Sequence, residues 1–294
     1  MYFYLFLCSL IRTFAAEKKL FSVKIKQVLS ALEQFAPLPL QESWDNAGLQ
    51  VGLTEAEVSG ALLCLDVNEQ IVDEALRKGC NLIVSHHPLL FRGLKRISDS
   101  DYVQRCVIKA IKHDIVIVSM HTNMDNAKDG VNWKIASRLG LDDVRFFAAK
   151  TMQLPGFEGD GNVDTVEYGS GVIGTLPQPM AATDFVQLVK KQFGVACAQC
   201  NELLQRPIRK VAICGGAGDF LLDDAVREGA DAFITGEMHY HVYFDHEQKI
   251  QICVIGHYQS EQYTTEVFRD IIARACPGVR TEIAETNTNP IVYL

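Results

Sequence analysis

The chain has 294 residues, of which 48% are hydrophobic and 22% are charged, as is typical of a globular protein with one or two domains. Its 28 Lys and Arg residues against 36 Asp and Glu residues give a net charge of −8, and no basic run occurs, so we do not expect a nucleic-acid partner. No apolar run reaches the roughly 18 residues of a membrane span, so we expect no membrane association either.

The chain begins with an apolar extension over residues 1–23. We predict that it is a tail or the product of a start codon placed too early. A signal peptide is the alternative, against which stand the interruption at Arg12 and the lack of a basic first segment. The folded part is predicted to begin near Lys24.

From residue 24 to residue 140 the sequence alternates between helices and buried strands, which we take as a first α/β half. Helices are predicted over residues 25–35, 69–78, 102–112 and 131–139, and strands over residues 61–65, 82–84 and 115–118. Continuous apolar runs indicate strands buried on both faces, and their alternation with helices is typical of parallel β-α-β units.

Residues 141–170 break this rhythm, and we interpret them as a junction. The alternation resumes in a second α/β half, residues 171–294. Its helices are predicted over residues 182–193, 221–227 and 264–275, and its strands over residues 172–173, 211–214, 232–234 and 252–255.

The two halves resemble each other at an offset of 150 residues. Residues 73–79 match residues 223–229, and residues 82–85 match residues 232–235. We predict an internal duplication, although any two helix–glycine–strand units look somewhat alike. The expected fold is α/β, with two related halves, mainly parallel sheets, and a functional site in the cleft between the halves.

The nine cysteines are odd in number, and Cys64, Cys80, Cys214 and Cys253 lie in strand-like apolar runs. We therefore predict reduced, buried thiols in a cytoplasmic protein. Cys197 and Cys200 have the spacing of a zinc or redox pair, but without a second pair we interpret them as a chance occurrence.

Three clusters of potential metal ligands each follow a buried strand. They are His86 with His87, His121 with Asp125, and His257 with Glu261. Ligands bind at the carboxyl ends of strands in open α/β sheets, so these side chains could meet in one site. Mixed imidazole and carboxylate ligation suits zinc, manganese or iron. One open catalytic ion needs fewer ligands than these, so we predict two ions bridged by a carboxylate, the alternative being unrelated surface residues.

Two other segments are candidates for parts of the site. Glu237 occupies the position of His87 in the second half and is predicted to support a ligand or to carry protons, unless it is simply a solvated residue. Residues 43–52, which include Trp44, are predicted to fold over the cleft; a packed tryptophan with turn glycines is the alternative.

A glycine-rich turn joins a strand to a helix in the second half. Gly215, Gly216 and Gly218 could bind an anion through free N–H groups. The turn lacks the lysine of a P-loop, and a tight turn capped by Asp219 is the interpretation that we favour.

These motifs together resemble one known family. The matching segments are residues 43–52, 84–88, 91–93, 119–125, 214–219, 235–237, 256–257 with Glu261, and 289–290. They are similar to the NGG-one-interacting-factor-three-like proteins, which are also called GTP cyclohydrolase I type 2 homologues. The chain looks like the compact form, without the inserted middle domain of longer members.

The resemblance implies a di-metal centre at strand ends and a toroidal homohexamer. It further implies that His87 and Asp125 bind one ion, that His86 and His257 bind the other, and that Glu261 bridges them.

The function predicted on this basis is that of a metal-dependent hydrolase, similar to a type 2 GTP cyclohydrolase. It would act on a nucleotide-like or phosphorylated small molecule through a metal-bridging water, and His121 or Glu237 would move protons. The alternative is a non-catalytic scaffold that binds or delivers metal and interacts with partner proteins. A nucleic-acid-binding regulator fits the negative charge poorly.

Overall fold

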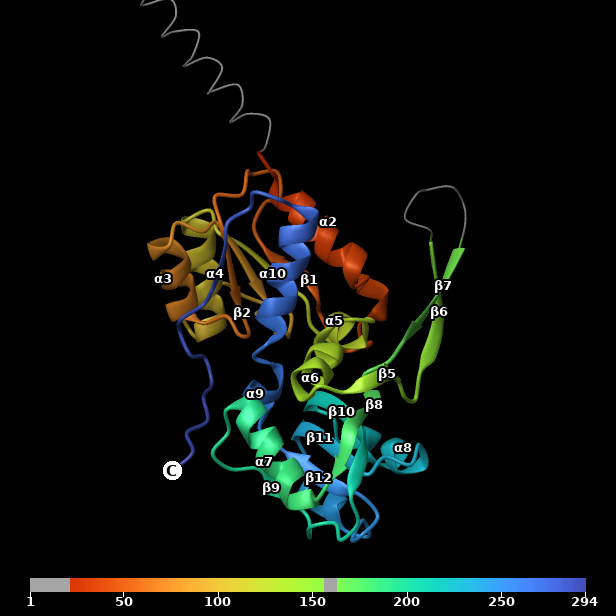
Figure 1. The fold of residues 1–294 in the computed structure, drawn as a ribbon. Coiled ribbons are helices and arrows are strands. Elements are labelled where there is room, and N and C mark those ends of the chain that lie inside the picture. Colours follow the sequence, from red (N-terminus) through yellow and green to blue (C-terminus); the bar gives the residue numbers. More distant parts are fainter. Residues whose placement is uncertain (1–21, 156–162) are drawn as a thin grey trace, which may run out of the picture.

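The protein has an α/β fold built on two β-sheets, and the computed structural model describes residues 22–155 and 163–294 (Figure 1). The first sheet has the strand order β1-β4-β3-β2-β13. Its strands are Gly48–Val51 (β1), Ala61–Cys64 (β2), Leu82–Ser85 (β3), Val116–Ser119 (β4) and Thr281–Ile283 (β13). Strands β2, β3, β4 and β13 run parallel, whereas β1 pairs antiparallel with β4.

The second sheet has the strand order β5-β8-β10-β11-β12-β9. Its strands are Asp142–Phe146 (β5), Val172–Met180 (β8), Gln199–Cys200 (β9), Ile208–Ala217 (β10), Ala232–Glu237 (β11) and Gln251–Val254 (β12). Strands β10, β11 and β12 run parallel. The other pairings are antiparallel. This sheet is therefore mixed rather than mainly parallel, because β8 and β9 run opposite to β10, β11 and β12.

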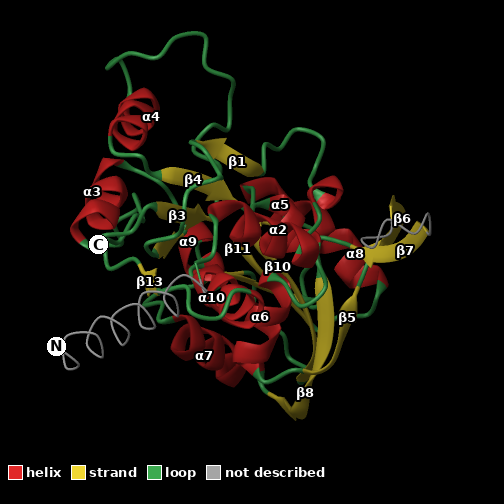
Figure 2. Cartoon of the chain, turned by 90° about the horizontal axis from the view of Figure 1, so that it is seen from above, coloured by secondary structure: helices red, strands yellow, loops and turns green. Residues whose placement is uncertain are grey.

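Helices lie between the two sheets and on their outer faces (Figures 1 and 2). They are Ile25–Phe35 (α2), Glu69–Arg77 (α3), Tyr102–Lys112 (α4), Thr122–Asn126 (α5), Val131–Leu139 (α6), Ala182–Phe193 (α7), Leu222–Arg227 (α8), His257–Glu261 (α9) and Thr264–Ala275 (α10). The bounds predicted for α2, α4, α6, α7 and α10 are confirmed at both ends. Within the described part of the chain, no helix combines the length and hydrophobicity needed to cross a membrane.

The central core joins the two sheets. Leu63 and Val84 of the first sheet share one cluster of buried side chains with Val211 and Ile213 of the second, together with the inner faces of α2, α6 and α10. Because successive strand residues point to opposite faces, Leu62 packs instead on the outer side, against α3 and α4. The continuous apolar runs of the sequence are thus explained by strands that are covered on both faces.

The predicted junction, residues 141–170, contains three strands that the sequence analysis missed. β5 joins the second sheet, and Lys150–Pro155 (β6) pairs with Val163–Tyr168 (β7) in a hairpin that projects from the body of the protein (Figure 1). In β5 only Phe146 is buried. Strands that are mostly exposed do not produce the apolar runs by which buried strands are recognised.

The last part of the chain returns from the second sheet to the first. After α10, strand β13 pairs in parallel with β2, so residues from the predicted second half complete the first sheet. The division of the chain into two halves stays a prediction.

A buried carboxylate holds this returning segment. Glu74 on α3 accepts hydrogen bonds from the backbone N–H of Glu285 at 2.8 Å and of Thr286 at 3.0 Å, and from the Thr286 hydroxyl at 2.6 Å. The Lys78 ammonium lies 3.1 Å from the same carboxylate. Burial opposes ionisation, but these hydrogen bonds prevail and lower the pKa of Glu74 to about 2.

Replacing Glu74 with Gln is expected to destabilise the protein by about 1–3 kcal/mol near neutral pH. The carboxylate ionises near its ordinary pKa of 4.5 in the unfolded chain and at about 2 in the folded protein. Its contribution is therefore present above the unfolded pKa and is lost as the pH falls toward 2. Urea unfolding of chelator-treated protein should show the difference between Glu74→Gln and wild type shrinking with acid.

Asp73→Asn, on the same helix, is the matched control. Asp73 is exposed and forms a surface ion pair with Lys109, so its replacement should cost less than about 1 kcal/mol. A Glu74→Gln effect that stayed constant down to acidic pH would contradict the role assigned to this carboxylate.

Candidate metal centre

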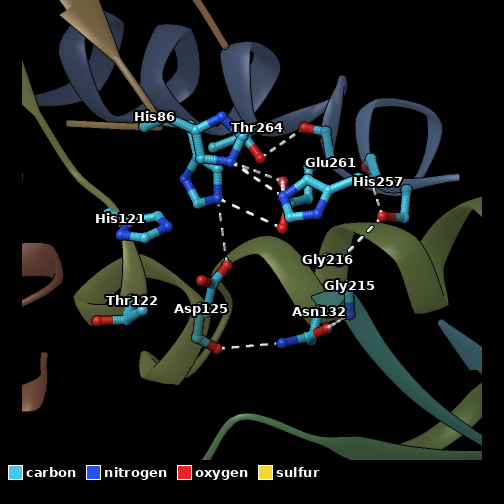
Figure 3. Close-up of polar contacts among 12 residues, drawn as sticks. His86, His121, Thr122, Asp125, Asn132, Gly215, Gly216, His257, Glu261 and Thr264 are labelled. Atoms are coloured by element: carbon cyan, nitrogen blue, oxygen red, sulfur yellow. Dashed lines mark hydrogen bonds and ion pairs between the residues drawn. The ribbon is translucent and has the colours of Figure 1, made fainter. Parts of the chain in front are cut away.

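Five of the predicted ligands converge from three places in the chain: the end of β3, helix α5 and helix α9 (Figure 3). His86 and His87 directly follow β3, and Asp125 lies on α5. His257 and Glu261 begin and end α9, where the spacing of four residues puts both side chains on one face of the helix.

The ligand atoms form three groups that could each hold a metal ion. One is His86, His87 and His121, and the other two share Glu261. In one of these two groups, His86 Nε2 lies 3.6 Å from Asp125 Oδ1 and 3.7 Å from Glu261 Oε1. In the other, Glu261 Oε2 lies 3.1 Å from His87 Nε2 and 3.2 Å from His257 Nε2. Ligands bound to a tetrahedral zinc ion at about 2.0–2.1 Å lie roughly 3.3 Å from one another, so both groups have the spacing of a metal site.

The groups differ in membership from the ligand pairs that the resemblance implied. His86 lies with Asp125, and His87 lies with His257, rather than the reverse. The physical reason is that adjacent residues at the end of an extended strand point to opposite sides. His86 therefore turns toward α5, and His87 turns toward α9.

Two buried atoms indicate that the cluster is built for a cation. His86 Nε2 and Asp125 Oδ1 are inaccessible to solvent and have no hydrogen-bond partner among the described residues. A buried polar atom without a partner costs about 1–3 kcal/mol. Both atoms face the same point, where a divalent ion would satisfy them, so the residues present fit a metal.

Hydrogen-bond acceptors on the side away from the other ligands orient the rings of His86, His87 and His257. Each Nδ1 faces a hydrogen-bond acceptor. These acceptors are Met120 O for His86 at 2.9 Å, Asp66 Oδ1 for His87 at 2.7 Å and Glu237 Oε1 for His257 at 3.0 Å. An Nδ1–H that donates to such an acceptor leaves the Nε2 lone pair directed into the site, which is the usual support of a metal-binding histidine.

The analysis of the sequence missed Asp66. It is the second residue after strand β2, just as His87 is the second residue after β3, and its second oxygen accepts a hydrogen bond from Thr288 at 2.6 Å. A carboxylate after a buried strand was the signal that could have found it. Glu237, which the sequence did single out, lies behind His257 on the side away from Glu261.

The electrostatics of the cluster favour positive charge. Burial lowers the pKa of His87, but hydrogen bonds to Asp66 and Glu261 outweigh it and raise that pKa to about 10. Burial also lowers the pKa of His257, but the hydrogen bond to Glu261 outweighs it and raises that pKa to about 8. Burial and the charge of Glu261 raise the pKa of Asp125 well above its usual value. The cluster thus holds protons, which a metal ion has to displace on binding.

His121 faces the same cluster without belonging to either of the groups that contain Glu261. Its ring centroid lies 5.3 Å from those of both His86 and His87. Its Nδ1 lies 2.8 Å from Asp45 Oδ1, and Asp45 also accepts hydrogen bonds from the Thr122 backbone at 3.0 Å and hydroxyl at 2.5 Å. Burial opposes ionisation of Asp45, but His121 and Thr122 lower its pKa to about 2. A permanently charged Asp45 therefore orients His121.

Backbone and side-chain hydrogen bonds fix the site across the two sheets. Buried Asn132 on α6 donates to Asp125 O at 3.2 Å and accepts from Gly215 N at 2.8 Å (Figure 3). The other two candidate anion-binding amides are also used within the chain, Gly216 N by Ser260 Oγ and Gly218 N by Thr235 Oγ1, each at 3.0 Å. All three amides thus have partners within the chain, and this geometry gives no support to the alternative of an anion-binding turn.

A cavity of about 160 Å³ opens over the ligands. Asp125, His257 and Glu261 line it together with His121 and with Trp44, whose side chain is exposed. The segment of residues 43–52 thus borders the cavity rather than packing its tryptophan inside.

A second cavity, of about 420 Å³, lies behind His257 and is lined by Glu237 and His239. In the described part of the chain, neither His239 nor Cys197 and Cys200 belong to a group of potential metal ligands. The described cysteines are free, and Cys64, Cys80, Cys214 and Cys253 are buried as predicted.

Fold and site together define an α/β protein with a buried cluster of His, Asp and Glu side chains that could hold metal ions. A family model, Duf34/NIF3 (NGG1p interacting factor 3), matches residues 23–290. The chain belongs to this family, which confirms the resemblance inferred from its motifs.

Relatives match over nearly their whole length. The GTP cyclohydrolase 1 type 2 homolog of Clostridium acetobutylicum is 31% identical over 91% of this chain and 97% of its own. The protein of the same name from Clostridium perfringens is 35% identical over 81% of this chain and 87% of its own. A crystal structure of a Staphylococcus aureus hypothetical protein superposes with a TM-score of 0.82 at 27% identity, covering 93% of this chain and 100% of that one.

Proposed function

We propose that the protein is a metal-dependent hydrolase with two divalent ions, acting on a nucleotide-like or otherwise phosphorylated small molecule. The observation that carries the proposal is the pair of ligand groups that share Glu261. In one of these groups, His86 Nε2 and Asp125 Oδ1 are buried and have no hydrogen-bond partner among the described residues. The name of the relatives, GTP cyclohydrolase 1 type 2 homolog, supports the choice of substrate class.

Each of the two ligand groups that share Glu261 would hold one ion. His86 and Asp125 would hold one ion, His87 and His257 the other, and Glu261 both; zinc, manganese or iron would suit this mixture of imidazole and carboxylate. When bound, two such ions would acidify a water molecule and stabilise negative charge on the substrate. Asp66 and Glu237 orient the imidazoles.

His121 is the group assigned to proton transfer. It borders the cavity beside the ligands, and charged Asp45 holds its Nδ1–H. The Nε2 of His121 is then free to accept a proton inside the cavity and to return it later. Glu237 is assigned to orienting His257, because it bonds to the ring nitrogen that points away from Glu261.

Asp45→Asn is expected to lower kcat by about 100-fold or more while the metal content stays unchanged. An amide at this position can donate to Nδ1 and so favour the tautomer of His121 that has no free lone pair at Nε2. The measurement is steady-state kinetics beside elemental analysis of the same sample. Unchanged kcat in the variant would remove His121 from the mechanism.

The decisive test combines metal content with turnover. Wild type loaded with zinc, manganese or iron should retain about two equivalents after desalting, and it should hydrolyse at least one member of a panel of GTP, cyclic nucleotides and phosphoesters. His86→Ala and Asp125→Asn should each retain about one equivalent, and so should the double variant, because both residues serve the same ion. Two bound ions without any turnover would instead favour the metal-binding or metal-delivery scaffold with protein partners.

We infer that the two halves arose by internal duplication and form the cleft that contains the site. The register supports this: Ala61 pairs with Leu82 in the first sheet, and Val211 pairs with Ala232 in the second, both shifted by 150 residues. The first half would be residues 24–140, and the second half would be residues 171–294. Refolding of each segment alone tests whether either half is an independent unit.

We also propose that the protein works in the cytoplasm as a toroidal homohexamer. Free, buried thiols are typical of a reducing compartment. The hexamer rests on the family resemblance, and light scattering should give six times the 32.7 kDa of one chain. A monomeric mass would refute it.

A further inference from the structure

The cavity above the ligands has aromatic side chains at its walls. Trp44 and Phe220 both line it, and their side chains are 58% and 64% exposed. Trp44 comes from the loop after α2, and Phe220 comes from the turn after β10, so the cavity receives one exposed aromatic from each sheet's side of the site. A single exposed aromatic is ordinary, but Trp44 lies beside Phe91, which is itself 47% exposed, so exposed aromatic surface gathers next to the cavity.

The Trp44 ring is held in place by its neighbours. It lies 5.9 Å from the Phe91 ring and 6.0 Å from the His121 ring between centroids. Asp45, the next residue along the chain, is anchored by His121 and Thr122. A rigid aromatic surface at this position loses little conformational entropy when a flat ligand stacks on it.

The size and charge of the cavity restrict what can bind. Its volume of about 160 Å³ is close to that of cavities that take up a single aromatic ring. Glu42 also lines it, so its carboxylate can accept a hydrogen bond from a ring N–H. The side chains therefore suit a planar nitrogen heterocycle better than a sugar or an aliphatic chain.

We propose that Trp44 and Phe220 form an aromatic clamp that binds the planar nitrogen heterocycle of the substrate. The inference rests on the proposed function, because it takes the metal ligands to bind the phosphorylated part of the same molecule. The clamp names the substrate class more closely: a flat heterocyclic base joined to a phosphate-bearing group.

The test compares two probes that differ only in the base, adenosine 5′-monophosphate and ribose 5-phosphate, by calorimetry with the metal-loaded full chain. Stacking on an aromatic side chain is worth about 1–3 kcal/mol, so the nucleotide should bind about fivefold to 150-fold more tightly. Trp44→Ala and Phe220→Leu should each reduce this preference, and Trp44→Phe should retain most of it. Phe244→Leu, an equally exposed aromatic that does not line the cavity, is the matched control.

The outcomes separate the clamp from the hydrolase. Equal binding of the two probes, no binding of the nucleotide, or an unchanged preference in Trp44→Ala would overturn the clamp, whatever the turnover screen shows. A preference for the nucleotide that depends on Trp44 but persists in metal-free protein without turnover would support the clamp and contradict the hydrolase. Tryptophan fluorescence gives an independent readout: the nucleotide but not ribose 5-phosphate should quench it in wild type, and neither should quench it in Trp44→Phe, which leaves only Trp133.

Discussion

Glu261→Gln is expected to abolish binding of both of the proposed metal ions. One carboxylate oxygen of Glu261 faces His86, and the other lies at 3.1–3.2 Å from His87 and His257. Glutamine keeps the shape but loses the charge, and only one of its two terminal atoms can coordinate an ion. Loss of an outer hydrogen-bonding partner already costs 10–100-fold in metal affinity, so loss of the shared ligand should cost more than about 100-fold.

Elemental analysis after desalting measures this effect directly. We expect close to zero equivalents in Glu261→Gln against about two in wild type. Glu266→Gln provides the matched control, since Glu266 lies five residues further on and pairs with Lys134 away from the cluster. Circular dichroism should show both variants folded. If Glu261→Gln kept two equivalents, the shared-ligand arrangement would be wrong.

Gly216→Ala is expected to disrupt the metal centre without replacing a ligand. A Cβ atom at Gly216 would lie 2.3 Å from Glu261 Oε1 and 3.4 Å from His257 Cε1. The nearest obstacle is the end of a flexible side chain, so the protein can still fold by moving the carboxylate. The displaced carboxylate can no longer serve both ligand groups, and metal affinity should fall by more than about tenfold.

Gly229→Ala separates this effect from backbone strain. Gly216 has φ +62° and Gly229 has φ +70°, so an alanine pays a similar penalty of about 1 kcal/mol at either position. No atom lies within 4 Å of a Cβ at Gly229. Both variants should therefore lose similar unfolding free energy in chelator, measured with urea, while only Gly216→Ala loses metal. Equal metal retention in the two variants would show that the close approach of Gly216 has no role in positioning Glu261.

The close approach at Gly216 also explains the glycine-rich turn in physical terms. Its amides hold Ser260, Thr235 and Asn132 rather than an anion. Because Gly216 has no side chain, the Glu261 carboxylate can lie against the turn and reach the imidazoles. The sequence left both a tight turn and an anion-binding loop open, because free and occupied N–H groups look alike in a sequence.

Local patterns were sufficient for most of the elements. Helices such as α4 and α6 repeat their apolar residues at helical spacing, and β2, β3 and β4 are buried on both faces, so their signals depend only on nearby residues. The exposed strands β5, β6 and β7 carry no such signal. β13 was missed because its pairing with β2 joins residues about 220 positions apart.

The candidate ligands could be selected from the sequence because imidazole and carboxylate groups recur there directly after buried strands. Their partners were not readable. Three features depend on how two sheets, which share a common core, direct side chains toward one point. They are the histidine that lies with Asp125, the carboxylates that support the rings, and the aromatics that border the cavity. Spacing along a chain determines the direction of a side chain relative to its own element, whereas distances between elements follow only from packing.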